Sequence, residues 1–182
     1  MTTALINPTV NSEDQAKVKA IFDQVEAQMG FVPDGLKLYS ISPPLLESFV
    51  GNVGYFMTHK TLSPELLAMI RYLISNDAHC RFCIDFNASL LINKLGKSQD
   101  QLNAATENPD NSPLTSNEII LLKIALASIE NPEKVTKEDL DKARAAGYSD
   151  RDLFDAVAIA ANNKAFTHLL RTFKVEQQGV FG

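Results

Sequence analysis

Apolar residues recur three or four positions apart along most of the chain, which is the spacing of an α-helix that packs on one side. One such run, from Val18 to Met29, stops at Gly30, and glycine favours the left-handed conformation that closes a helix. Strict alternation of apolar and polar residues, typical of strands, is nearly absent. The pattern predicts an all-α protein.

Polar residues mark where these helices begin. Ser12 and Thr115 each precede a glutamine or glutamate by three residues, the spacing of a capping box, and Pro43 and Pro64 each follow a serine at a first helical position. The first predicted helix opens at the Ser12 cap and stops at Gly30, and the others cover residues 35–40, 43–58, 64–77, 80–96, 116–130, 136–147 and 150–173. Residues 96–113 are polar and are expected to form a short helix plus a loop. Short connections between helices predict a bundle of antiparallel neighbours. We expect a single domain over residues 1–182, with 1–11 as a flexible N-terminal arm.

Length and charge narrow the functional class. A chain of 182 residues suits one domain. The net charge of -5, without any cluster of lysine and arginine, argues against nucleic-acid or acidic-membrane partners. The first residues lack the pattern of a secretory signal, and no apolar run reaches the roughly 20 residues that cross a bilayer. We therefore expect a cytoplasmic protein whose thiols stay reduced.

The chain has two cysteines, and they form the motif Cys80-Arg81-Phe82-Cys83 at a predicted helix start. Unpaired N–H groups at a helix N-terminus favour the thiolate, and Arg81 and His79 add positive charge nearby. Such a pair attacks a peroxide or disulfide with one sulfur and resolves the product with the other. The motif predicts a redox-active dithiol.

Three other interpretations of the two cysteines stay open at this point. Buried cysteines are often inert. A CxxC pair can also be half of a zinc site, which would need two further ligands from a chain whose histidines are His59, His79 and His168. A thioredoxin-type site needs a βαβ context that a helical sequence does not supply. We expect no cofactor and no metal.

The motif and its surroundings resemble a known family. The residues concerned are Leu62-Ser63-Pro64-Glu65, Met69-Ile70-Arg71 and Asn76-Asp77-Ala78-His79-Cys80-Arg81-Phe82-Cys83. They are similar to the core of the alkylhydroperoxidase D-like proteins of the carboxymuconolactone decarboxylase superfamily. Flanking segments near residues 30–34, 43–46, 160–163 and 173–176 resemble its peroxidase-related branch, so the likeness covers about residues 30–176.

The resemblance implies a small helical protomer that assembles into a homo-oligomer, as a dimer, trimer or hexamer. It also implies a thiol-dependent peroxidase with no bound cofactor, which takes a hydroperoxide substrate and is reduced by a dithiol protein or small thiol. Cys83 would attack the peroxide and Cys80 would resolve the product. The family's proton relay uses a glutamate and a histidine, but here those positions hold Ala68 and Asn87. Asn87 lies one helical turn after Cys83, so a hydrogen bond to the thiolate is reasonable, although an amide cannot act as a base.

Three residues are candidates to replace the relay, and each has a plainer interpretation. Glu65 lies one turn before Ala68, but a carboxylate there also complements the helix dipole at the surface. His79 adjoins Cys80, and histidine is a common proton-transfer group, but His79 is equally a solvent-facing loop residue. His168 borders the apolar side of the last helix and is equally a packed side chain. Two functions therefore stay open, a thiol-dependent peroxidase or disulfide reductase and a catalytically degenerate or thiol-sensing relative. A decarboxylase activity rests on the superfamily name alone.

Overall fold

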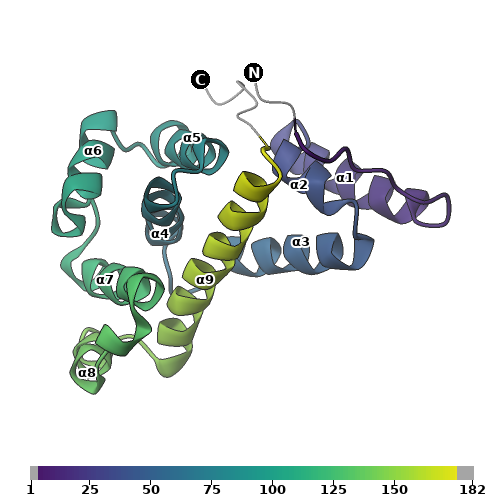
Figure 1. Ribbon diagram of the computed structural model, residues 1–182. Helices are drawn as coiled ribbons and strands as arrows, with labels where there is room; N and C mark the ends of the chain where they lie inside the picture. The colour runs from purple at the N-terminus through teal and green to yellow at the C-terminus, as the bar shows by residue number, and fades with distance from the viewer. Residues whose placement is uncertain (1–3, 176–182) are drawn as a thin grey trace.

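The computed structural model describes residues 4–175, and within this range the chain forms nine α-helices and no strand (Figure 1). The helices are α1 (Gln15–Met29), α2 (Asp34–Tyr39), α3 (Pro43–Met57), α4 (Pro64–Asp77), α5 (Arg81–Ser89), α6 (Gln99–Glu107), α7 (Ser116–Glu130), α8 (Lys137–Ala145) and α9 (Asp150–Thr172). A π-helical turn, η1 (Leu90–Lys94), and two 3-10 turns, η2 (Pro109–Asn111) and η3 (Pro132–Lys134), complete the pattern. The predicted all-α fold is confirmed.

Most helix starts follow the predicted caps. The Ser63 hydroxyl accepts a hydrogen bond from the Leu66 N–H at 3.0 Å, and Thr115 forms a full capping box with Glu118. The capping box predicted at Ser12 does not form. Instead, the carbonyl of Asn11 accepts the N–H groups of Asp14 and Gln15 in a turn, and α1 begins only at Gln15.

The predicted helix from 80 to 96 is divided in two. Regular α-helix ends at Ser89, and the chain continues through η1, where the Leu95 N–H bonds the Leu90 carbonyl five residues earlier. Leu91, within this wider turn, is fully buried. The π-helical turn thus places Leu91 in the core.

Helix α4 is the centre of the molecule. Every residue from Leu66 to Ile70 is buried, so α4 is covered on several sides, mainly by α5, α7 and α9. The long α9 lies between the helices α4 to α8 and the group α1 to α3 (Figure 1).

Within residues 4–175, no helix combines the length and apolar character that crossing a bilayer requires.

Candidate active site

The turn between α4 and α5 positions the two cysteines. The His79 N–H bonds the Asn76 carbonyl at 2.9 Å and the Cys80 N–H bonds the Ser75 carbonyl at 3.0 Å, the two hydrogen bonds of a Schellman motif. His79 has the left-handed conformation that this motif requires, with φ 51°. Cys80 is then the N-cap of α5, and the side chain of His79 is exposed. The structure therefore gives His79 a conformational role.

The two cysteines are free thiols whose sulfurs lie 2.7 Å apart. Each residue is only 2% exposed. Apolar side chains enclose them: Ile6, Leu38, Phe82, Phe166, Leu170, Phe173 and Val175. The N-terminal segment is held there by a hydrogen bond from the Leu5 N–H to the Phe173 carbonyl, at 2.9 Å. A substrate can reach the sulfurs only when part of this cover moves.

The two thiols differ in acidity. The hydrogen bond between the sulfurs lowers the pKa of Cys80, and the Cys83 N–H and the charge of Arg171 act in the same direction, while burial opposes them. The same hydrogen bond, together with burial and the charge of Cys80, raises the pKa of Cys83. An N-cap sulfur next to the unpaired N–H groups of a helix is a favourable place for a thiolate. The site therefore favours a thiolate on Cys80 and a proton on Cys83.

Asn87 binds the backbone at the dithiol. Its Nδ2 donates to the Cys83 carbonyl at 2.8 Å, and its Oδ1 accepts from the Nε of Arg71 at 3.0 Å. The hydrogen bond to a sulfur that the sequence suggested is not made. Burial lowers the pKa of the Arg71 guanidinium to about 10, so it is still a cation at neutral pH. Arg71 could have been singled out as a charge in an otherwise apolar stretch of α4.

The candidate replacements for the proton relay do not meet the sulfurs. No hydrogen bond joins Glu65, His79 or His168 to either cysteine. Glu65 lines an open depression with Lys97, Pro113, Leu114, Thr115 and Glu118, and His168 is exposed on α9. Ala68 is fully buried, so a glutamate there would bury a carboxylate in the apolar core.

Asp85, which the sequence analysis missed, is a carboxyl group near the dithiol. Its Oδ2 is buried without a hydrogen-bond partner among the described residues. Burial raises the pKa of Asp85, and the positive charge of Arg81 partly opposes this effect. The negative charge of the Asp85 carboxylate acts to raise the pKa of Cys80. The sequence shows Asp85 only as a partner for Arg81 one helical turn away. A carboxyl group of raised pKa can hold or release a proton here.

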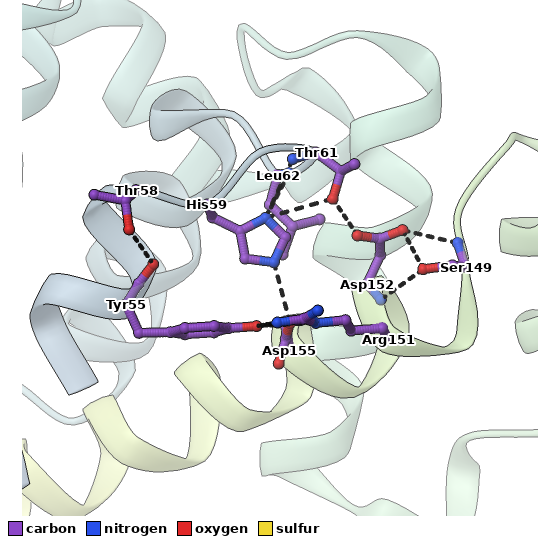
Figure 2. A network of polar contacts seen from close by, with 9 residues as sticks. All are labelled: Tyr55, Thr58, His59, Thr61, Leu62, Ser149, Arg151, Asp152 and Asp155. Atoms are coloured by element: carbon purple, nitrogen blue, oxygen red, sulfur yellow. Dashed lines mark hydrogen bonds and ion pairs between the residues drawn. The ribbon is translucent and has the colours of Figure 1, made fainter. Parts of the chain in front are cut away.

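A second polar network lies where α3 ends and α9 begins (Figure 2). The Nδ1 of His59 accepts the Leu62 N–H at 3.0 Å, and its Nε2 lies 3.1 Å from Oδ2 of Asp155. The Tyr55 hydroxyl donates to the same oxygen at 2.5 Å. Both ring nitrogens of His59 are thus occupied, which makes it a link between the two helices. Within residues 4–175, no three metal-ligating side chains gather.

Comparisons with known proteins agree with this architecture. No protein-family model and no curated protein matches the chain. Among solved structures, an uncharacterized peroxidase-related protein from Silicibacter sp. TM1040 superposes with a TM-score of 0.83 at 18% identity, over 100% of this chain and 97% of that one. An uncharacterized peroxidase-related protein from Ralstonia eutropha JMP134, described as an alkylhydroperoxidase AhpD core, superposes with a TM-score of 0.86 at 17% identity, over 100% of this chain and 95% of that one. The chain has the alkylhydroperoxidase D-like fold.

The alkylhydroperoxidase D-like fold carries more than one activity. The debrominase Bmp8, in a cysteine-to-alanine variant bound to 2,3,4-tribromopyrrole, superposes with a TM-score of 0.75 at 22% identity, over 100% of this chain and 95% of that one. The TM-scores establish the fold that the sequence resemblance implied, and identities of 17–22% show nothing beyond the fold.

Proposed function

We propose that the chain is a thiol-dependent peroxidase and disulfide reductase that uses Cys80 and Cys83. The observation that carries the proposal is the pair of free thiols 2.7 Å apart at the N-terminus of α5, with the thiolate favoured on one sulfur and the proton on the other. Peroxidase-related proteins that share the fold give the proposal its substrate class.

The reaction needs no bound cofactor. A thiolate attacks the outer oxygen of a hydroperoxide, the O–O bond breaks, and the alkoxide leaves and takes a proton to become an alcohol. The sulfenic acid formed on the first sulfur is then attacked by the second, which releases water and forms the Cys80–Cys83 disulfide. A dithiol protein or small thiol reduces this disulfide by exchange, and is itself oxidised. One hydroperoxide is thereby reduced for each dithiol consumed.

The order of the two sulfurs is a separate question. The family pattern assigns the attack to Cys83, whereas the acidity of the pair favours the Cys80 thiolate. A sulfenic-acid trap with mass spectrometry distinguishes the two. If Cys80 attacks, Cys83→Ser accumulates one trapped sulfenic acid per chain and Cys80→Ser reacts slowly; the opposite result assigns the attack to Cys83.

The proposal is tested by the rate of hydroperoxide consumption with a dithiol reductant. The double variant with serine at both positions should lose the activity, because serine cannot form the sulfenic acid. Equal rates in the wild-type protein and the double variant would refute the proposal. Loss of bromide from 2,3,4-tribromopyrrole, followed in parallel, checks whether the chain shares the debrominase activity instead.

A second candidate is a catalytically degenerate or thiol-sensing protein. Two observations favour it: the relay positions hold Ala68 and Asn87, and both sulfurs are almost fully covered. Because a glutamate at the fully buried position 68 would place a carboxylate in the apolar core, Asn87→His is the informative variant. If the wild-type protein consumes hydroperoxide slowly and Asn87→His consumes it much faster, the second candidate is supported. If the wild-type protein already consumes hydroperoxide fast, the second candidate is ruled out.

We extend the proposal to the remaining expectations. The reductant is a dithiol protein or small thiol of the cytoplasm, where such reductants are abundant. The protomer assembles into a dimer, trimer or hexamer of identical chains. Light scattering of the purified protein tests the assembly, and a monomer at all concentrations would contradict it.

A further inference from the structure

Helix α9 is apolar on two of its sides. The buried side packs against α4 and α7 and includes Leu153, Ile159 and Leu170. A second side, which we call the outer face of α9, consists of Phe154, Ala158, Ala161, Ala165 and Leu169. These residues follow one another at intervals of three or four positions, so they lie along one side of a helix with 3.6 residues per turn.

The outer face is open to solvent in a single chain. Phe154 is 73% exposed and Leu169 is 39% exposed. The alanines between them are exposed or half-buried, and in Figure 1 no other helix passes over α9. A surface helix normally carries charged residues on its solvent side, as α8 does with its ion pairs. An apolar face of this length therefore calls for a cover that residues 4–175 of one chain do not supply.

The outer face is complementary to itself when it is reversed in direction. Phe154 and Leu169 lie equally far along the chain from the point just after Ala161. Ala158 and Ala165 are placed symmetrically about the same point. Two antiparallel copies of α9, related by a twofold axis through this point, thus place Phe154 of one copy opposite Leu169 of the other. The alanines meet between them, and their small side chains let the helix axes approach to about 8 Å, the lower end of the usual range.

The charges at the two ends of α9 agree with this arrangement. Asp150 and Asp152 lie in its first turn, and Arg171 lies in its last turn. An antiparallel pair brings the acidic first turn of one copy next to the basic last turn of the other, which favours this pairing over a parallel one. Arg151 is directed elsewhere, because its guanidinium donates to the Tyr55 hydroxyl of its own chain at 3.0 Å.

We propose that the outer face of α9 is the interface between two copies of this chain, which pack their α9 helices antiparallel about a twofold axis near Ala161. Twofold interfaces, in which residue i contacts residue j and j contacts i, are the commonest in homo-oligomers. The inference rests on the homo-oligomer proposed above and does not depend on the peroxidase activity. The paired face ends beside the dithiol, because Leu169 adjoins Leu170, which packs over the two cysteines.

Sedimentation velocity of the full chain tests this interface with the variant Ala161→Glu, which places two carboxylates against each other at the axis. We expect a mass of at most about half that of the wild-type protein at the same concentration, because a buried unpaired charge is costly. Ala145→Glu is the matched control, since Ala145 is an exposed alanine of α8, and it should keep the wild-type mass. If the wild-type protein is an oligomer and Ala161→Glu leaves its mass unchanged, the outer face is refuted alone. A monomeric wild-type protein would overturn the homo-oligomer as well.

A cross-link tests the direction of the pairing without introducing a charge. The background is the variant with serine at positions 80 and 83, which has no other thiol. In this background, Ala161→Cys places two thiols at the axis, and mild oxidation should join most chains into disulfide-linked dimers. Phe154→Cys should cross-link far less, because in an antiparallel pair its counterpart lies about 22 Å away along the helix. Cross-linking that is as strong at position 154 as at position 161 would refute the antiparallel pair.

Discussion

Gly35, the second residue of α2, lies against the aromatic side chains that cover the dithiol. A Cβ added at this position would lie 2.7 Å from Cζ of Phe166 and 3.2 Å from Cε1 of Phe82. Carbon atoms in favourable contact are about 3.5–4.0 Å apart, so the helix or a ring has to move. Gly35→Ala therefore probes how tightly the cover over the cysteines is packed.

The expected cost follows from what holds Phe166 in place. Its ring is stacked on Phe49 and also on Tyr39, with centroids 4.7 and 5.7 Å apart, so it cannot turn away without disturbing both. Overpacking of this kind costs about 1–3 kcal/mol. Alanine recovers up to about 1 kcal/mol through its higher helix propensity. Gly54→Ala, in α3, obtains only that gain, because nothing lies within 4 Å of its added Cβ.

The assay is urea unfolding of both variants, followed by circular dichroism. Gly35→Ala should be less stable than Gly54→Ala by about 1–3 kcal/mol, since the propensity gain is common to both. Alkylation of the cysteines by iodoacetamide should also become faster in Gly35→Ala, because a displaced ring uncovers the sulfurs. A Gly35→Ala protein as stable as Gly54→Ala would refute the packing argument.

Three further predictions concern the turn, the second polar network and the thiols. His79→Gly should keep the free energy of unfolding or raise it by up to about 1 kcal/mol, because glycine accepts a positive φ without cost. Its peroxide turnover should equal that of the wild-type protein. A large fall in turnover would give His79 a chemical role. Asp155→Ala removes the hydrogen-bond acceptor of the buried His59 and of Tyr55, so it should lower the free energy of unfolding by about 2–4 kcal/mol, measured by thermal unfolding. Asp150→Ala removes an exposed carboxylate and should lower it by under about 1 kcal/mol. Equal losses in the two variants would contradict this prediction. Because the pKa of Cys80 is lowered, its rate of alkylation should rise with pH at a lower midpoint than that of a free cysteine. Cys83→Ala should move this pH midpoint upward, and Cys83→Ser, which keeps a hydrogen-bond donor, should move it less. An unchanged midpoint in Cys83→Ala would refute the assigned cause.

The helices could be predicted because their signals are local. Spacing of apolar residues, a serine or threonine cap and a terminal glycine are all properties of a few neighbouring residues, as at Ser63 and Gly30. The π-helical turn after Ser89 was not predictable in this way. Its wider winding goes with the burial of Leu91, which depends on helices distant in sequence.

The candidate site was predictable in its chemistry and less so in its electrostatics. The CxxC spacing indicated two adjacent sulfurs at a helix start, and the structure brings them together there. The importance of Arg71, Asp85 and Gly35 depends on which side chains from other helices lie beside them. Arg71 at least stands out as a charge in an apolar stretch of α4, but no local pattern marks Asp85 or Gly35, because their neighbours come from other helices. Roles of the individual sulfurs stay predictions until the single variants are measured.

The hydrogen bond between Leu5 and Phe173 has a practical consequence for anyone who prepares the protein. It joins the first and last parts of the described chain directly over the cysteines, together with the side chain of Ile6. A substitution or label at Leu5 or Lys174 therefore lies beside the cover on the dithiol, and the unlabelled protein is the proper reference for any rate. The same proximity makes Leu5 and Lys174, which are both exposed, a suitable pair of attachment points for fluorescent labels. A change in energy transfer between them would report the moment at which the dithiol becomes accessible.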